Sequence, residues 1–216
     1  MSFTLFLSGC RCASDSASTT PPLESVELPA HGAALLIPQL GVTTPVPVLI
    51  ALAPESECQR LSQLKAYSFH LLCSPRGDGQ AIRGLLKEFR SKYSPYLAAS
   101  PVVLLALDAP MSRRARELAL ENPAFFGHLI LSEASQLNIS NTFVYTYRER
   151  GGQSLFLIGV NAANFVKESE QAERKGLLLR TYQGSAEQPA GQLEQVFSEI
   201  VGIDPRFLPR SNKKRP

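Results

Sequence analysis

The segment PVVLLALDAPMSRRARELAL, residues 101–120, decides the fold class. Residues 102–106 form an uninterrupted apolar run, which is typical of a central parallel strand that is covered on both faces. Residues 112–120 place arginine and glutamate among alanine and leucine, as expected for a helix with one face against a sheet. The segment therefore predicts a buried strand, a sharp turn and an amphipathic helix.

The rest of the chain repeats this alternation of apolar runs and amphipathic stretches. Further strands are predicted at 25–28, 33–38, 46–53, 67–73, 126–131, 142–147, 154–160 and 177–182, and further helices at 56–64, 81–93, 161–175 and 193–201. The first two strands are expected to pair as a hairpin. Alternation of this kind predicts a three-layer α/β fold, in which helices flank a mainly parallel sheet.

Length, composition and charge limit the functions that the chain can have. With 216 residues and 44% hydrophobic content, one domain with a sizeable core is expected, at residues 23–204. Residues 205–216 are predicted to form a solvated basic tail, with five basic and no acidic side chains. Without this tail the chain carries 17 basic and 19 acidic side chains, so nucleic-acid binding is unsupported.

Residues 1–22 have features of an export signal followed by a Ser/Thr-rich tether. Leu7-Ser8-Gly9-Cys10 resembles a bacterial lipobox, which would place a lipid on Cys10 and attach the protein to a membrane of the cell envelope. The apolar run before it is short, and no basic residue precedes it. The alternative is a fortuitous match and a cytoplasmic protein. No segment approaches the roughly 20 apolar residues that span a bilayer.

Several local features resemble the α/β-hydrolase superfamily, and in particular its bacterial esterase-like members. They are the strand end Leu72–Gly77, the strand, turn and helix of residues 101–120, the connection Asn122–Phe126 and the strand Leu155–Val160. The order of the predicted elements resembles the superfamily over residues 28–201. The resemblance implies a nucleophilic serine on the sharp turn after the central strand, with an acid and a histidine after later strands.

The chemistry that the resemblance implies is missing from this sequence. The serine position falls on Ala109, in a degenerate turn that begins with Asp108. The loop that should supply the oxyanion donors contains Pro54, which has no N–H. The acid would lie within 161–164, where no carboxylate occurs, and the histidine within 183–188, where no histidine occurs. A catalytically inactive protein is the most economical interpretation.

The alternative is an active esterase-like hydrolase with displaced machinery, in which Asp108 is the nucleophile. Such an enzyme needs a base, for which His70 and His128 are the only candidates on predicted strands. Against this alternative, an aspartate before Ala109-Pro110 also suits the N-cap of the helix that follows.

Cys58 and Cys73 complete the set of candidate residues. Similar esterase-like sequences carry a cysteine pair at comparable places, which implies a disulfide, although Cys73 also suits a small buried strand residue. No metal-binding spacing and no dinucleotide fingerprint occurs, so no cofactor is predicted. The sequence thus favours an exported α/β-hydrolase-like protein without catalysis, acting as a binding or scaffold module for a ligand or protein that it does not identify.

Overall fold

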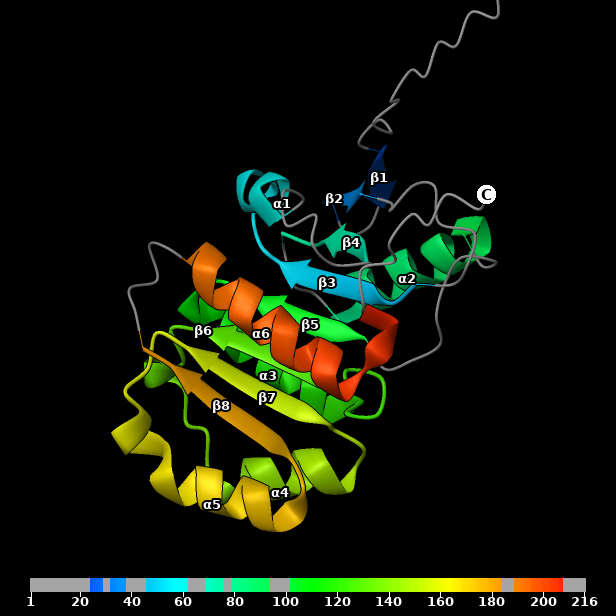
Figure 1. Cartoon of the computed structure of the whole chain (residues 1–216). Coiled ribbons are helices and arrows are strands. Elements are labelled where there is room, and N and C mark those ends of the chain that lie inside the picture. The colour runs from blue at the N-terminus through cyan, green and yellow to red at the C-terminus, as the bar shows by residue number, and fades with distance from the viewer. Residues whose placement is uncertain are drawn as a thin grey trace, which may run out of the picture.

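Eight strands form one sheet in the order β1-β2-β4-β3-β5-β6-β7-β8, as the computed structural model shows for the part of the chain that it describes (Figure 1). The described residues are 24–28, 32–37, 46–61, 69–75, 79–93, 102–183 and 189–207. The strands are β1 (Glu24–Leu28), β2 (Gly32–Ile37), β3 (Val48–Leu52), β4 (His70–Cys73), β5 (Val103–Ala106), β6 (His128–Ser132), β7 (Ser154–Ile158) and β8 (Leu178–Tyr182).

Strands β3 to β8 run parallel, whereas β2 pairs antiparallel with both β1 and β4. The predicted initial hairpin and the predicted mainly parallel sheet are therefore both confirmed. The helices are α1 (Glu55–Leu61), α2 (Gly79–Tyr93), α3 (Ala109–Glu121), α4 (Asn141–Glu149), α5 (Val166–Lys175) and α6 (Pro189–Ile203), with short 3-10 turns η2 (Ala134–Gln136), η3 (Ala162–Phe165) and η4 (Pro205–Phe207).

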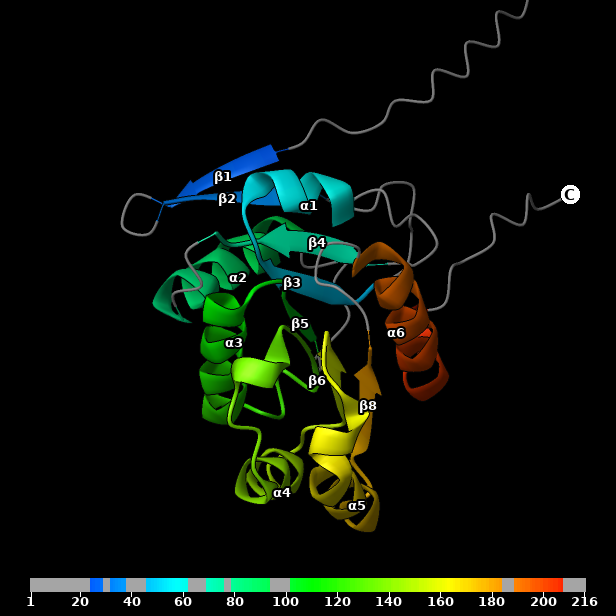
Figure 2. The same cartoon turned by 90° about the vertical axis from the view of Figure 1, so that its left-hand side faces the viewer.

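The helices form the two outer layers of the fold. Alternate strand residues such as Leu104 and Leu129 pack under α2, α3, α4 and α5, and their neighbours Leu105 and Ile130 pack under α1 and α6. Figure 2 shows α2 and α3 on one side of the sheet and α6 on the other. The continuous apolar runs of the central strands follow from this arrangement, because both faces of each strand are buried.

Residues 142–147 form part of helix α4, so the prediction of a strand there is wrong. The alternation of Val144, Tyr145 and the residues that follow fits a strand, but Ser140 caps a helix by accepting a hydrogen bond from the N–H of Phe143. Phe143, Val144 and Tyr147 then lie on one buried face with helical spacing. The local cap therefore outweighs a short alternating pattern.

Both ends of the chain extend beyond the described residues. The predicted export segment at residues 1–22, with Cys10, lies outside them, and so do residues 208–216 of the predicted tail. Residues 205–207, which the charge distribution places in the tail, form η4, and Phe207 is completely buried there. Among the described helices, none has the length and apolar character needed to span a membrane.

Candidate functional site

The carboxyl end of β5 is where the topology favours a ligand site. The sheet order reverses there, because β4 lies outside β3 while β6 lies outside β5. In open α/β sheets, ligands bind in the crevice at the carboxyl ends of the strands at such a reversal. Asp108 and Ala109 follow β5 at this point, and Glu133 follows the neighbouring strand β6.

Asp108 is the N-cap residue of α3. Its backbone is extended, with φ −134° and ψ 169°, and its Oδ1 accepts a hydrogen bond of 2.7 Å from the N–H of Met111. Pro110 occupies the first turn, where a missing N–H is tolerated. The prediction that Asp108 caps this helix is therefore confirmed.

Glu133 is a second carboxylate at the same helix end. Its backbone is left-handed, with φ 52°, and its Oε2 accepts a hydrogen bond of 3.2 Å from the N–H of Ala109. It is the one non-glycine residue with positive φ among the described residues. A left-handed backbone is strained for a residue with a Cβ, so this hydrogen bond is made at a conformational cost.

Every backbone N–H in the first turn of α3 is accounted for. Ala109 donates to Glu133, Met111 donates to the Asp108 carboxylate, and Ser112 donates to the Asp108 carbonyl oxygen at 2.8 Å. Pro110 has no N–H. The Ser112 hydroxyl is also used, because it is fully buried and donates to the Ser132 carbonyl oxygen at 2.6 Å. Two carboxylates thus close the helix terminus that would otherwise attract an anion.

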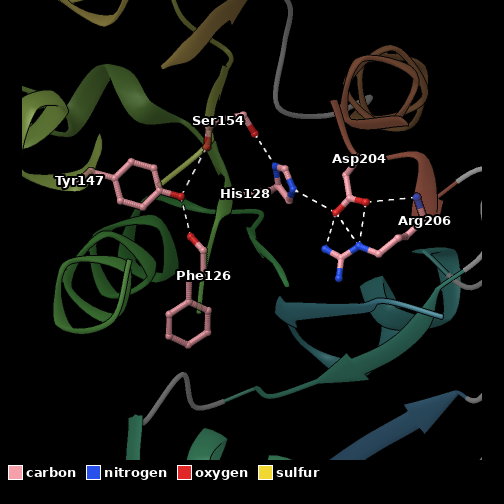
Figure 3. A network of polar contacts seen from close by, with 6 residues as sticks. All are labelled: Phe126, His128, Tyr147, Ser154, Asp204 and Arg206. Carbon is pink, nitrogen blue, oxygen red and sulfur yellow. Dashed lines mark hydrogen bonds and ion pairs between the residues drawn. The ribbon is translucent and has the colours of Figure 1, made fainter. Parts of the chain in front are cut away.

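A second group of polar residues lies at the opposite, amino edge of the same strands (Figure 3). His128 and Ser154 are register partners at the starts of β6 and β7, and the His128 Nδ1 lies 2.9 Å from the Ser154 Oγ. The His128 Nε2 lies 3.7 Å from the Oδ2 of Asp204, which follows α6. Both His128 and Ser154 are completely buried.

Arg206 neutralises the carboxylate of this network. Its Nε lies 2.8 Å and 3.0 Å from the two oxygens of Asp204, its Nη2 contacts Oδ2, and its backbone N–H donates to Oδ1 at 3.1 Å. Burial acts to raise the pKa of Asp204, but the hydrogen bonds from Arg206 and the contact with His128 outweigh burial. The pKa of Asp204 therefore lies well below its usual value, and the carboxylate stays ionised.

Tyr147 joins the network to the helix layer. Its hydroxyl donates to the Phe126 carbonyl oxygen at 2.6 Å, and the Ser154 carbonyl oxygen lies 3.5 Å away (Figure 3). Burial of the whole side chain raises the pKa of the Tyr147 hydroxyl far above its usual range, so it remains a donor. On the other side, the Phe207 ring meets the His128 ring edge-on at a centroid distance of 6.1 Å.

A disulfide links Cys58 in α1 to Cys73 at the end of β4, with the Cα atoms 6.2 Å apart. Both half-cystines are buried, and Cys73 is the register partner of Ala51 in β3. The bond therefore fastens the short helix α1 over the carboxyl ends of two neighbouring strands. It agrees with the pairing expected from similar esterase-like sequences.

Comparison with known proteins identifies the fold. Neither a protein-family model nor a curated protein sequence matches this chain. A solved structure of a lipase/esterase from Lactobacillus plantarum is similar in fold, with a TM-score of 0.51 and 9% sequence identity, over 86% of this chain and 98% of that chain. The fold is α/β-hydrolase-like.

In an α/β-hydrolase, the nucleophile stands on a strained turn after β5, and a backbone N–H at the start of the next helix helps to bind the oxyanion. In this chain the serine position, Ala109, is buried within the first turn of α3, and its N–H is bonded to Glu133. The residue after it, where the family donor would lie, is Pro110, which has no N–H. The carboxylates of Asp108 and Glu133 would also repel a developing oxyanion. The turn is therefore arranged to cap a helix.

Neither histidine proposed as a base reaches Asp108. His128 is the register partner of Val103, and Asp108 lies five residues further along that direction. At about 3.3 Å per residue, this places the two residues roughly 16 Å apart along the sheet. His70 begins β4 at the same amino edge, where it is the register partner of Val48. An Asp108 nucleophile would thus lack both of these bases, and the third histidine, His31, lies outside the described residues.

Ser154, His128 and Asp204 have the residue types of a hydrolytic triad but not its arrangement. In a triad the serine bonds to Nε2 and the carboxylate to Nδ1. Here serine lies on Nδ1, and the carboxylate lies on the Nε2 side. His128, Ser154 and Asp204 line none of the three cavities between α2 and α3, between α3 and α4 and between α5 and β8. The group is therefore a buried polar network without the arrangement of a hydrolytic triad.

Sequence reasoning did not find this network, although one signal was present. His128 and Ser154 open consecutive parallel strands, so their register partnership follows from the strand order. Asp204 lies far along the chain at the end of α6, and the sequence does not reveal its approach to His128. At the other family positions, Asn161 caps η3 through its Oδ1, and residues 184–188 after β8 lie outside the described residues.

Proposed function

We propose that this protein is a catalytically inactive α/β-hydrolase-like protein that acts by binding. The single observation that carries the proposal is the closed N-terminus of α3: Asp108 and Glu133 occupy its N–H groups, and Pro110, which follows the serine position, has no N–H for an oxyanion. A protein that keeps the hydrolase scaffold and fills its reactive position offers surfaces rather than chemistry. Binding a ligand or a protein partner is the function that remains.

We also propose that the protein is exported to the bacterial cell envelope and anchored there through Cys10. Two observations support this part of the proposal. The lipobox-like sequence at residues 7–10 ends at that cysteine. The disulfide between Cys58 and Cys73 suits an oxidising compartment. In a bacterial host, Cys10→Ser is expected to move the protein from the membrane fraction to the soluble fraction; an unchanged distribution would contradict lipid anchoring.

The test of catalytic inactivity is hydrolysis of a panel of activated acyl esters by the full chain. Variants Ala109→Ser and Asp108→Asn are assayed beside the parent, with far-ultraviolet circular dichroism to show that each is folded. We expect no turnover above buffer from any of the three, because a serine at position 109 would still lack both a base and free oxyanion donors. Turnover by the parent that disappears in Asp108→Asn would overturn the proposal and make Asp108 the nucleophile.

The Ser154→Ala variant distinguishes an active site in the buried network of His128, Ser154 and Asp204 from a contaminating esterase. If the parent hydrolyses an ester and Ser154→Ala abolishes this in a folded protein, the network is catalytic and the proposal is wrong. Activity that all variants share equally, and that is removed by further purification, belongs to a contaminant and leaves the inactive interpretation supported.

A further inference from the structure

Among the described residues, strand β8 forms one edge of the sheet and pairs on one side only, with β7 (Figure 1). The N–H of Leu178 donates to the carbonyl oxygen of Gln153, and the carbonyl oxygen of Tyr182 accepts from the N–H of Gly159. The backbone groups of the even-numbered residues of β8 therefore face β7. In a parallel ladder the alternate residues then point their backbone groups outward. Leu179 and Thr181 therefore direct their N–H groups away from the sheet.

A groove of about 640 Å3 lies along this edge, between β8 and α5. One wall is the sequence 177–181, which includes the outward-facing backbone, and the other is a single face of α5. That face consists of Val166, Ser169, Glu170 and Glu173. An exposed sheet edge can accept an extended peptide as an added strand, and neighbouring pockets then select its side chains.

The side chains of the α5 wall indicate the chemistry of the partner. Val166 is 53% exposed, one of the few large apolar side chains so exposed among the described residues. Glu170 and Glu173 form no ion pair with any described residue. Arg180 also lines the groove, and its guanidinium pairs with Glu199 of α6 at 3.1 Å and donates to the Leu179 carbonyl oxygen at 3.3 Å. The α5 wall of the groove is therefore acidic, with an apolar contact at one end.

We propose that this groove binds an extended, basic peptide segment of a partner protein, which adds as a strand to the free edge of β8. The inference rests on the proposed binding function and supplies its surface. The outward N–H groups of Leu179 and Thr181 donate to the peptide backbone, and its lysine or arginine side chains face Glu170 and Glu173. A second copy of this chain fits less well, because β8 paired with β8 brings two acidic α5 walls together.

The direct test is fluorescence anisotropy with the full chain and the labelled peptide Lys-Thr-Lys-Val-Lys-Thr-Lys. We expect saturable binding that weakens with added salt, and no binding of the matched peptide in which glutamate replaces lysine. Two further versions carry N-methyl groups on either the odd or the even residues, which blocks one edge of the peptide at a time. One version is expected to lose binding and the other to keep it, because only one edge faces β8. Equal binding by both versions would overturn strand addition.

Variants of the groove locate the binding site. Glu170→Gln combined with Glu173→Gln is expected to weaken binding by about three- to tenfold, as typical of two exposed ion pairs. Glu168→Gln, on the same helix but outside the groove lining, is the matched control and should leave affinity unchanged. Thr181→Pro removes an outward N–H at a position where an edge strand tolerates proline, and should abolish binding. Unchanged affinity in the double glutamine variant would remove the groove from consideration.

Two readouts separate this inference from the proposed function. Ester turnover by a protein that also binds the peptide would overturn catalytic inactivity and leave the groove supported. A folded protein that hydrolyses no ester and binds none of the peptides would refute peptide binding in the groove, and would leave the proposal of catalytic inactivity supported. Sedimentation velocity provides the last outcome: a concentration-dependent dimer that Thr181→Pro dissociates would assign the edge to a second copy and refute the peptide proposal.

Discussion

Replacing Asp204 with asparagine is expected to lower the free energy of unfolding by about 2 kcal/mol at neutral pH. Asparagine preserves the shape of the side chain and one carbonyl oxygen. It removes the negative charge that accepts hydrogen bonds from the Arg206 guanidinium and backbone. It also places an NH2 donor next to a guanidinium or to the His128 ring, where an acceptor is needed.

The structure sets the size of this effect. Breaking a fully buried ion pair costs about 3 to 5 kcal/mol. The Asp204 side chain is only 9% exposed, but that of Arg206 is 32% exposed, so water compensates part of the loss. Exposed pairs contribute about 0.2 to 1 kcal/mol. A value near 2 kcal/mol lies between these limits.

The loss of stability caused by Asp204→Asn should be largest at neutral pH and smaller in acid. Because folding lowers the pKa of Asp204, its ionised form stabilises the folded protein above the pKa of the unfolded chain. This contribution is complete above about pH 5 and is lost as the pH falls below about 4. The difference in stability between parent and Asp204→Asn should therefore shrink in acid.

Urea denaturation followed by circular dichroism, repeated between pH 3 and pH 7, measures both quantities. Glu117→Gln is the control, because its exposed pair with Arg114 should contribute less than about 0.5 kcal/mol. An Asp204→Asn variant as stable as the parent at pH 7 would refute the structural role of the network. A loss of stability that does not change between pH 7 and pH 3 would refute the electrostatic argument.

Three further perturbations test other parts of the fold. Asp108→Ala removes the cap of α3 and should lower the free energy of unfolding by about 1 kcal/mol, measured by urea denaturation. Gly152→Ala should cost about 1 to 3 kcal/mol in the same assay, because the added Cβ would lie 2.5 Å from the Tyr147 ring. Reduction of the disulfide between Cys58 and Cys73, 15 residues apart in sequence, should lower stability by about 3 kcal/mol, seen as a lower Tm in dithiothreitol.

Each of these perturbations has a matched control. Asp108→Asn keeps a side-chain acceptor and should retain most of the parent stability. Gly202→Ala adds a Cβ in α6 where nothing lies within 4 Å, and should stabilise by about 0.5 to 1 kcal/mol. The Cys58→Ala, Cys73→Ala double variant should be insensitive to dithiothreitol. If Asp108→Ala and Asp108→Asn have the same free energy of unfolding, the capping argument is wrong. If Gly152→Ala and Gly202→Ala change it equally, the packing argument is wrong.

Local patterns predicted the central elements of this fold well. The apolar run at 102–106 and the arginine-rich helix after it became β5 and α3, and the cap at Asp108 could be predicted because cap, proline and helix are adjacent in sequence. Residues 142–147 were misassigned because a short alternating pattern fits a strand and a capped amphipathic helix equally well. Such ambiguity is resolved by the cap at Ser140 and by packing against the sheet.

The candidate site was only partly accessible from sequence. The loss of a serine at Ala109 is a local property, whereas the second carboxylate at the same helix end comes from Glu133. The position of Glu133 depends on β6 being the neighbour of β5 and on a left-handed backbone after β6. The secondary-structure propensities of single residues indicate neither. The approach of Asp204 to His128 likewise depends on tertiary packing of α6.

The strand order also has a consequence for how the chain folds. Strands β5, β6 and β7 each pair with the next strand in the chain, as β3 does with β4, whereas β5 reaches back past β4 to pair with β3. Contacts that close shorter loops form at a lower entropic cost. We therefore expect the segment from β5 to β8 to supply the folding nucleus, and β3 and β4 to join it afterwards. The disulfide between Cys58 and Cys73 lies in this part of the sheet, which is expected to join last. Oxidation would therefore act on a nearly assembled protein and stabilise the docking of α1 and β4.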